Sequence, residues 1–210
     1  MDMIEAIYCL SRPDREERRV VLRPQLARAF AGGQLPTLPI RWWSEPLRDN
    51  VYVPTGFDNL AGYYAATVAH RLLLEDAWKN NFAEILVLED DARLDEEFYR
   101  SFTPFMEEIR LDFPDWLAVW LGGLMQSVPP VVLSDRVLRN KGTLHCHAYV
   151  VNRHGIARFL DVLYEDNKKV VDWAFMAVMR EDDCIYSPTS WQVGTTSFPS
   201  DNVPVIQRAL

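Results

Sequence analysis

The sequence predicts an α/β protein, in which residues 1–210 form one domain built on a single mixed sheet flanked by helices. Strand-like and helix-like segments alternate along the chain, as is typical of a sheet covered by helices on both faces. The clearest strand is the apolar run at residues 85–88, which reads as a strand buried on both faces. A length of 210 residues with 49% hydrophobic composition suits a domain with a substantial core.

The first half of the chain predicts two strands and two helices ahead of this apolar run. Residues 3–10 are expected to form the opening strand, and Pro13 lies in a polar break before a basic helix. Residues 40–43 are expected to form a short strand, and residues 62–80 a helix. The helix is indicated by apolar residues that keep to one face at helical spacing: Ala65, Ala69, Leu72, Leu73 and Ala77.

The second half continues the alternation. An apolar stripe at helical spacing follows the acidic strand, with Pro104 expected to break or kink that helix. Its members are Phe98, Phe102, Phe105, Met106 and Ile109. Strands are then expected at residues 115–122 and 147–152, helices at 155–164 and 173–179, and a loop-rich end from Pro188 onward.

Composition excludes several classes of function. A net charge of −8 argues against nucleic acid as the main partner, because phosphate binding needs clustered Lys and Arg. The three cysteines are widely separated, which argues against a disulfide framework or zinc site and favours a reducing compartment. No signal peptide is visible, and the apolar run at 116–125 is too short for the roughly 20 residues that span a bilayer. A soluble, cytoplasmic protein without a transmembrane segment is expected.

The apolar strand ends in three consecutive carboxylates, Glu89, Asp90 and Asp91. Open α/β sheets hold ligands at the carboxyl ends of their strands. Crowded carboxylates repel one another unless a cation lies among them, and oxygen ligands suit Mg²⁺ or Mn²⁺ together with substrate phosphates. This pattern predicts a metal–phosphate site. A second acidic run, residues 181–183, follows a helix and is expected to be a solvated loop.

Several short motifs occur in order along the chain and together resemble glycosyltransferase family 25, which includes bacterial lipooligosaccharide and collagen galactosyltransferases. They are the strand and Arg-rich turn at residues 7–15, Gly62 followed eight positions later by His70, the acidic strand end at 87–91, the W-x₅-G element at 116–122, the A-Y-x-V pattern at 148–151, and Val171-Asp172. The chain departs from the family at Ala65, Ala66 and Ala69, where Gly, Cys and Ser are usual, and at Leu117, where an acid is usual.

This resemblance implies a GT-A-like (Rossmann-like) fold in which the acidic strand end is the counterpart of the D-x-D motif. It further implies transfer of a hexose, galactose or glucose, from a UDP-sugar to a hydroxyl of a glycan or glycoconjugate, with inversion, as in lipopolysaccharide biosynthesis. A leaving nucleoside diphosphate is strongly anionic, so the expected cofactor is Mn²⁺ or Mg²⁺.

Roles are expected for individual acids of the cluster. Asp91 is the first choice for the direct metal ligand. Glu89, on the same side of the strand end, is expected to act on the metal through water or to bind the donor's ribose or sugar. Asp90 points the other way and is expected to bind the surrounding backbone within the donor site.

Other candidates lie near the first strand and on two histidine-bearing segments. Leu10, Ser11, Arg12 and Arg15 are expected to meet the nucleotide, although a solvated basic turn is an equal alternative for the arginines. His70 is a candidate catalytic residue or a satisfied buried histidine. His145 and His147 are expected to share one face of a strand, with His147 as a candidate third metal ligand.

Asp172 is the candidate general base, which inverting sugar transfer requires opposite the leaving group. The alternative for Asp172 is the N-cap of the helix at 173–179. Two other functions stay open: a sugar nucleotidyltransferase, for which the chain lacks a Gly-rich basic phosphate loop, and a non-catalytic binder of nucleotide or glycan.

Overall fold

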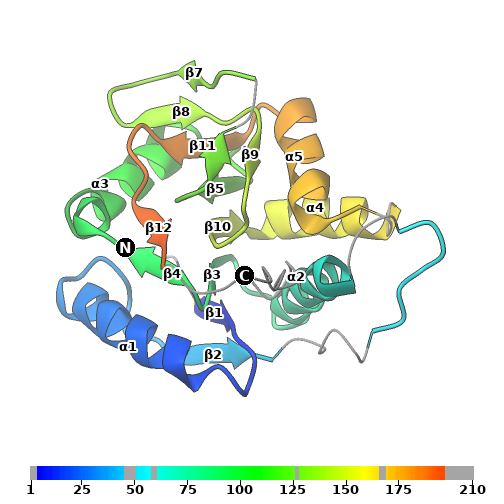
Figure 1. Ribbon diagram of the computed structural model, residues 1–210. Helices are drawn as coiled ribbons and strands as arrows, with labels where there is room; N and C mark the ends of the chain where they lie inside the picture. Colours follow the sequence, from blue (N-terminus) through cyan, green and yellow to red (C-terminus); the bar gives the residue numbers. More distant parts are fainter. Residues whose placement is uncertain (1–3, 45–50, 58–60, 126–127, 166–168, 197–210) are drawn as a thin grey trace, which may run out of the picture.

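A computed structural model describes residues 4–44, 51–57, 61–125, 128–165 and 169–196. Its centre is an eight-stranded mixed sheet with the order β2-β1-β3-β10-β5-β11-β8-β7 (Figure 1). The strands are β1 (Ala6–Leu10), β2 (Ile40–Trp43), β3 (Glu84–Glu89), β5 (Ala118–Trp120), β7 (Val131–Val132), β8 (Val137–Arg139), β10 (Ala148–Asn152) and β11 (Ile185–Pro188). The predicted mixed α/β sheet is confirmed, with residues 85–88 inside it on β3.

Two short ribbons and the helices complete the described fold. Strand β4 (Ala92–Leu94) pairs with β12 (Val193–Thr195), and β6 (Leu124–Met125) pairs with β9 (Thr143–Leu144). The helices are α1 (Glu16–Ala31), α2 (Ala61–Lys79), α3 (Glu96–Asp112), α4 (Arg153–Glu165) and α5 (Val171–Glu181). None of the helices in the described ranges has the length and apolar character needed to cross a membrane.

The apolar run of β3 is explained by burial on both faces of the sheet. Ile85 and Val87 pack in a core with α2, α4 and α5, whereas Leu86 and Leu88 pack in a second core with α1 and α3. The two groups of helices lie on opposite sides of the sheet in Figure 1. Burial of each such side chain contributes about 1.5–3 kcal/mol, so an apolar residue is favoured at every position of the strand.

Strand direction brings distant segments to one edge of the sheet. Strands β1, β2 and β3 are parallel, and Leu10 at the end of β1 pairs with both Trp43 and Glu89. Strand β10 runs antiparallel beside β3, with Ala148 opposite Leu88. The loop after β1, the acidic end of β3 and the loop before β10 therefore meet at the same edge.

Of the break or kink predicted at Pro104, the break is wrong, because α3 continues through it from Glu96 to Asp112, and the kink stays a prediction. A proline inside a helix removes one backbone hydrogen bond and costs about 3 kcal/mol. The apolar stripe of α3 is buried in the core with α1, and its several large side chains outweigh that cost. Asp95 caps the helix, since its carboxylate accepts hydrogen bonds from the backbone N–H groups of Glu97 and Phe98.

The other predicted elements are present with shifted ends. The opening strand begins at Ala6, and Met3 of its predicted range lies outside the described residues. The strand expected at 115–122 is the shorter β5, and the strand expected at 147–152 begins one residue later, at Ala148. The loop-rich end begins at the last residue of β11 and contains β12 within its described part.

Candidate functional site

The acidic strand end forms a fixed turn between β3 and β4. Glu89 is the last residue of β3, and Asp90 and Asp91 lead into β4 at Ala92. Strand β12 pairs with β4, and just beyond it the backbone N–H of Thr196 donates to the Asp91 carbonyl at 2.7 Å. The turn is therefore held by a segment that lies 105 residues further along the chain.

Asp90 is buried and committed to an ion pair. Its Oδ1 lies 3.0 Å from Nη1 of Arg18, with 9% of the Asp90 side chain and 8% of the Arg18 side chain exposed. Burial raises the pKa of Asp90, and Arg18 and the Ser11 hydroxyl offset only part of that effect. Asp90 thus meets Arg18 on α1, where the sequence predicted backbone groups as its partners.

Asp91 is the carboxylate of the turn whose charge is least compensated. Its Oδ1 is buried and has no hydrogen-bond partner among the described residues. Burial, together with repulsion from Glu89 and Asp90, raises its pKa to about 7. A half-buried carboxylate with a buried, unpartnered oxygen and little positive charge nearby gains most from a cation, which is compatible with the predicted metal-ligand role of Asp91.

Glu89 lies at the end of a chain of buried side chains. Its Oε1 is 3.4 Å from Nε2 of His70, and Nδ1 of His70 is 3.0 Å from the Tyr149 hydroxyl. Burial raises the pKa of Glu89, but the contact with His70 and the nearby His147 and His145 outweigh it, so its pKa lies below the ordinary value. The Glu89 side chain is 38% exposed, whereas that of His70 is 1% exposed.

The prediction that His145 and His147 share one face of a strand is wrong. Both precede β10, and His145 has a left-handed backbone (φ 72°), so strand alternation does not apply to them. His145 is exposed and His147 is buried, with their ring centroids 6.3 Å apart.

His147 is held against the β12 segment. Its Nε2 lies 3.2 Å from the Val193 carbonyl, while its Nδ1 is buried without a partner among the described residues. Burial lowers its pKa, so the imidazole is neutral at pH 7. Gly122 makes this packing possible, because a Cβ there would lie 2.5 Å from His147 Nε2 and 1.9 Å from the Val193 carbonyl oxygen.

Asp172 lies in the first turn of α5 and is hydrogen-bonded to Cys146, the residue before His147. The Cys146 thiol donates to Asp172 Oδ1 at 3.0 Å, and burial keeps the pKa of that thiol well above its ordinary value, so it remains a donor. The N-cap of α5 is Val170, without a side-chain cap, and Asp172 lies within the first turn. The alternative reading of Asp172 as the N-cap is therefore wrong.

The loop after β1 lines the other side of the acidic turn. Leu10 and Ser11 are buried, and Arg12 and Arg15 keep 31% and 27% of their side chains exposed. Both arginines contact acids of their own loop and helix: Arg12 pairs with Asp14 at 2.7 Å and Arg15 with Glu17 at 3.4 Å. Their guanidinium groups are thus partly engaged, and a role toward a nucleotide stays a prediction.

Three partners of the predicted residues were not singled out from the sequence: Arg18, Tyr149 and Val193. They contact Asp90, His70 and His147, respectively, and the two residues of each pair are 46 to 79 positions apart in the sequence. A faint signal existed for Arg18, which lies in the basic helix that follows the first strand. Within the described residues, no group of three or more His, Cys, Asp or Glu side chains is already arranged to hold a metal ion.

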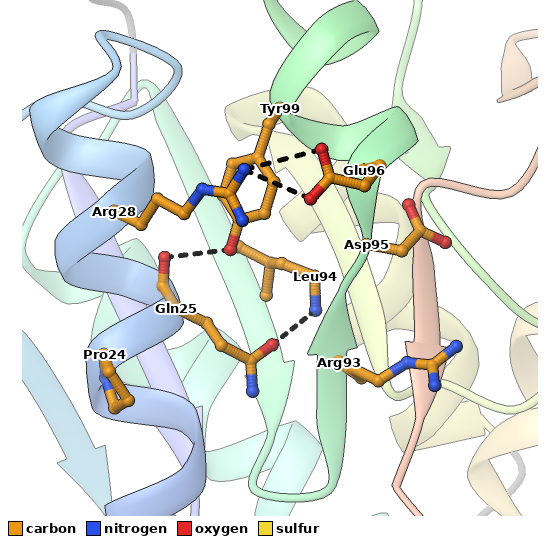
Figure 2. A pocket seen from close by; sticks show the side chains of 8 residues that line it. All are labelled: Pro24, Gln25, Arg28, Arg93, Leu94, Asp95, Glu96 and Tyr99. Atoms are coloured by element: carbon orange, nitrogen blue, oxygen red, sulfur yellow. Dashed lines mark hydrogen bonds and ion pairs between the residues drawn. The ribbon is translucent and has the colours of Figure 1, made fainter.

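A separate hollow of about 510 Å³ lies beyond the turn, open to solvent between α1 and the start of α3. It is lined by Pro24, Gln25, Arg28, Arg93, Leu94, Asp95, Glu96 and Tyr99 (Figure 2). Its polar groups largely satisfy one another, since Arg28 pairs with Glu96 at 3.1 Å and the Leu94 N–H donates to Gln25 at 2.8 Å. The acidic turn, not this hollow, carries the uncompensated charge.

Comparison with known proteins leaves the family open. No protein-family model and no curated protein matches the chain. One similar solved structure is a glycosyltransferase involved in the glycosylation of the major capsid of PBCV-1 (TM-score 0.43, 9% identity, 76% of this chain and 66% of that one). Another is mannose-1-phosphate geranyltransferase from Thermus thermophilus (TM-score 0.43, 14% identity, 86% of this chain and 58% of that one). Likeness this distant carries no argument about chemistry, and membership of family 25 stays a prediction.

Proposed function

We propose that this chain is a metal-dependent glycosyltransferase that moves a hexose from a UDP-sugar to a hydroxyl of a glycan or glycoconjugate. The observation that carries the proposal is the state of Asp91 at the carboxyl end of a central strand. Its side chain is half-buried beside two other acids, its Oδ1 is buried without a described partner, and its pKa is raised to about 7. Such a carboxylate gains most by binding a cation that also binds phosphate.

The side chains around the turn have the chemistry to hold Mn²⁺ or Mg²⁺, although among the described residues they are not already arranged as a three-ligand group. Asp91 would hold the ion directly, Glu89 would reach it directly or through water, and the free Nδ1 of neutral His147 is a further donor atom. When bound, the ion would compensate the negative charge of the departing diphosphate. Mixed oxygen and nitrogen donors favour Mn²⁺ over Mg²⁺ among these two.

The donor nucleotide would lie over the loop that follows β1. Ser11 and Arg12 continue the strand whose last residue, Leu10, pairs with Glu89, so this loop and the acidic turn are neighbours. Arg12 retains partial exposure and a forked guanidinium that matches a phosphate or a uracil carbonyl. Assignment of UDP, rather than another nucleotide, rests on the sequence resemblance to family 25.

The acceptor would be activated by Asp172. Its carboxylate would take the proton of the acceptor hydroxyl as that oxygen attacks the anomeric carbon and UDP departs from the opposite face. Trp173, the next residue, is 50% exposed and offers an aromatic surface next to Asp172. The α5 start is fixed on α2, because the Val171 N–H donates to Thr67 Oγ1 at 3.0 Å.

Incubation with a panel of UDP-sugars, Mn²⁺ and mixed glycan acceptors, with measurement of free UDP, tests the proposal. We expect UDP release that depends on Mn²⁺ and on acceptor. Release of pyrophosphate from a nucleoside triphosphate and sugar phosphate would instead identify a nucleotidyltransferase. Binding of UDP-sugar without any turnover would identify a non-catalytic descendant.

Asp172→Asn and Asp172→Ser sharpen the test of the chemical step. Loss of the base should lower the transfer rate by ~10²–10⁴-fold and leave UDP affinity nearly unchanged. Loss of a charge in the first turn of a helix costs only about 0.3–1 kcal/mol of stability, so both variants should fold. Asp161→Asn, at an exposed acid of the neighbouring α4, is the matched control. Wild-type turnover in both Asp172 variants would exclude Asp172 as the base.

A further inference from the structure

A buried hydrogen-bond chain leads from Tyr149 through His70 to Glu89. The Tyr149 hydroxyl lies 3.0 Å from Nδ1 of His70, and Nε2 of the same ring lies 3.4 Å from Oε1 of Glu89. Tyr149 is 0% exposed and His70 is 1% exposed, so neither can touch a substrate. Only the Glu89 end of the chain, with 38% of its side chain exposed, opens to the site.

The protonation of each group determines which atoms donate and which accept in these two hydrogen bonds. An ionised carboxylate only accepts hydrogen bonds, so Nε2 of His70 must carry the proton that faces Glu89. In the neutral ring Nδ1 is then an acceptor, and the Tyr149 hydroxyl is the donor that satisfies it. Tyr149 therefore favours the one tautomer of His70 that donates toward Glu89.

The surroundings hold both rings in place. Tyr149 stacks on Trp120 with ring centroids 5.1 Å apart and planes 13° apart. Phe175 lies edge-on to Tyr149 and to His70, at 5.9 and 6.1 Å. Glu89 is also held by its backbone, because its N–H donates to the His147 carbonyl at 2.8 Å. A ring packed on several sides changes its hydrogen bonds only if the packing changes.

We propose that Tyr149 and His70 are positioning residues: the Tyr149 hydroxyl fixes the Nε2–H form of His70, and His70 holds Oε1 of Glu89 so that Oε2 faces the ligand. His70, a candidate catalytic residue from its sequence, thus acts through Glu89 without contact with the reacting atoms. The ligand part of this proposal rests on the proposed function, whereas the direction of the hydrogen bonds does not. Partners of this kind commonly change metal affinity by about 10–100-fold when they are removed.

The direction of the hydrogen bonds can be measured without any ligand. The chain has four histidines, and two-bond ¹H–¹⁵N correlation spectra at pH 8 distinguish the two neutral tautomers of each. Loss of one signal in His70→Gln assigns the His70 resonances. We expect a single Nε2–H tautomer in the wild type and a mixture in Tyr149→Phe, where Nδ1 has lost its donor. An Nδ1–H tautomer in the wild type, or an unchanged spectrum in Tyr149→Phe, would overturn the proposal.

The consequence for the site is measured by calorimetric titration of UDP in the presence of MnCl₂. Tyr149→Phe keeps the ring and its packing and should weaken binding about 10-fold. Tyr8→Phe is the matched control, since Tyr8 is also fully buried in the same core and its hydroxyl bonds Asp76 on α2, away from Glu89. We expect it to stay within about twofold of the wild type, because no part of the Glu89 chain is altered.

Substitution at His70 adds a rescue test. His70→Gln retains an N–H that can point toward Glu89, whereas His70→Leu retains only bulk, so we expect the Gln variant to bind UDP with Mn²⁺ more tightly than the Leu variant. Equal binding in the two variants, or equal binding in Tyr149→Phe and Tyr8→Phe, would overturn the positioning role. Absence of UDP binding in the wild type would instead count against the proposed function, and the tautomer measurement would still decide the direction of the chain.

Discussion

Two runs of three acids occur in this chain, residues 89–91 and residues 181–183, and the structure treats them in opposite ways. The second run lies at the end of α5 and beyond it, where each carboxylate has a cation. Arg158 contacts Glu181 at 2.7 Å and Asp182 at 2.8 Å, and Lys141 contacts Asp183. The run expected to be a solvated loop is thus part of a partly exposed ion-pair network.

The first run is more deeply placed, with Asp90 buried and Glu89 and Asp91 half-buried, and it has less positive charge around it. Arg18 compensates Asp90 and His70 contacts Glu89, while an oxygen of Asp91 has no described partner. The pKa of Asp91 is raised to about 7 by burial and by its acidic neighbours, whereas the hydrogen bond from Lys141 lowers the pKa of Asp183. Acidic composition is the same in both runs, so burial and the cationic side chains nearby decide which run carries uncompensated charge.

The largest difference in stability between the two runs is expected when the arginine that pairs with each run is replaced. Arg18→Met leaves Asp90 buried beside two other acids, and loss of one partner of a buried pair costs about 3–5 kcal/mol. We expect this loss in urea unfolding at pH 8 and a smaller loss at pH 5, where Asp90 can take up a proton. A loss below about 1 kcal/mol at pH 8 would contradict the view that the first run depends on Arg18.

The next effect concerns ligand binding. Asp91→Asn should weaken Mn²⁺-dependent UDP binding by a few kcal/mol, about 100-fold, because a charged contact to the ion is lost. Asp183→Asn, in the second run, is the matched control and should leave the affinity unchanged. Calorimetric titration of UDP with and without Mn²⁺ measures both. Unchanged affinity in Asp91→Asn would exclude Asp91 as the metal ligand.

The same substitution should stabilise the protein without metal. The folded pKa of Asp91, about 7, lies above the unfolded value of 3.8, so the fold favours the protonated acid and loses stability as pH rises from the unfolded to the folded pKa. Asp91→Asn removes this penalty and should raise the free energy of unfolding by about 1–3 kcal/mol at pH 8. The gain should vanish near pH 4, which urea unfolding across pH can show. A destabilised Asn variant at pH 8 would contradict the uncompensated charge.

The smallest effect is expected at the second run. Arg158→Met breaks exposed ion pairs, which contribute about 0.2–1 kcal/mol and are screened by salt. We expect a loss of that size in dilute buffer, a smaller loss in 1 M NaCl, and no change in UDP binding. An effect as large as that of Arg18→Met would remove the distinction between the two runs.

Local pattern was enough to predict much of the fold. The apolar run of β3 and the helical stripes of α2 and α3 specify their elements because burial on a given face requires apolar residues at a fixed spacing. The position of the acidic triplet at the end of a central strand followed from the same run. Pro104 was misjudged because its local cost is smaller than the packing of a whole helix face, which local sequence does not reveal.

Tertiary structure alone decided which carboxylate of residues 89–91 lacks a partner for its negative charge, and which distant residues contact the acidic turn. Arg18 and Asp90 lie 72 positions apart, and Tyr149 and His70 lie 79 apart. These pairs meet because β1, which leads into α1, and β10 lie on either side of β3, an order of strands that no local pattern encodes. Charge compensation depends on distance and burial in space. The sequence therefore determined where the acids gather, and the packing of distant elements determined that Asp91 is the acid with an oxygen that has no described partner.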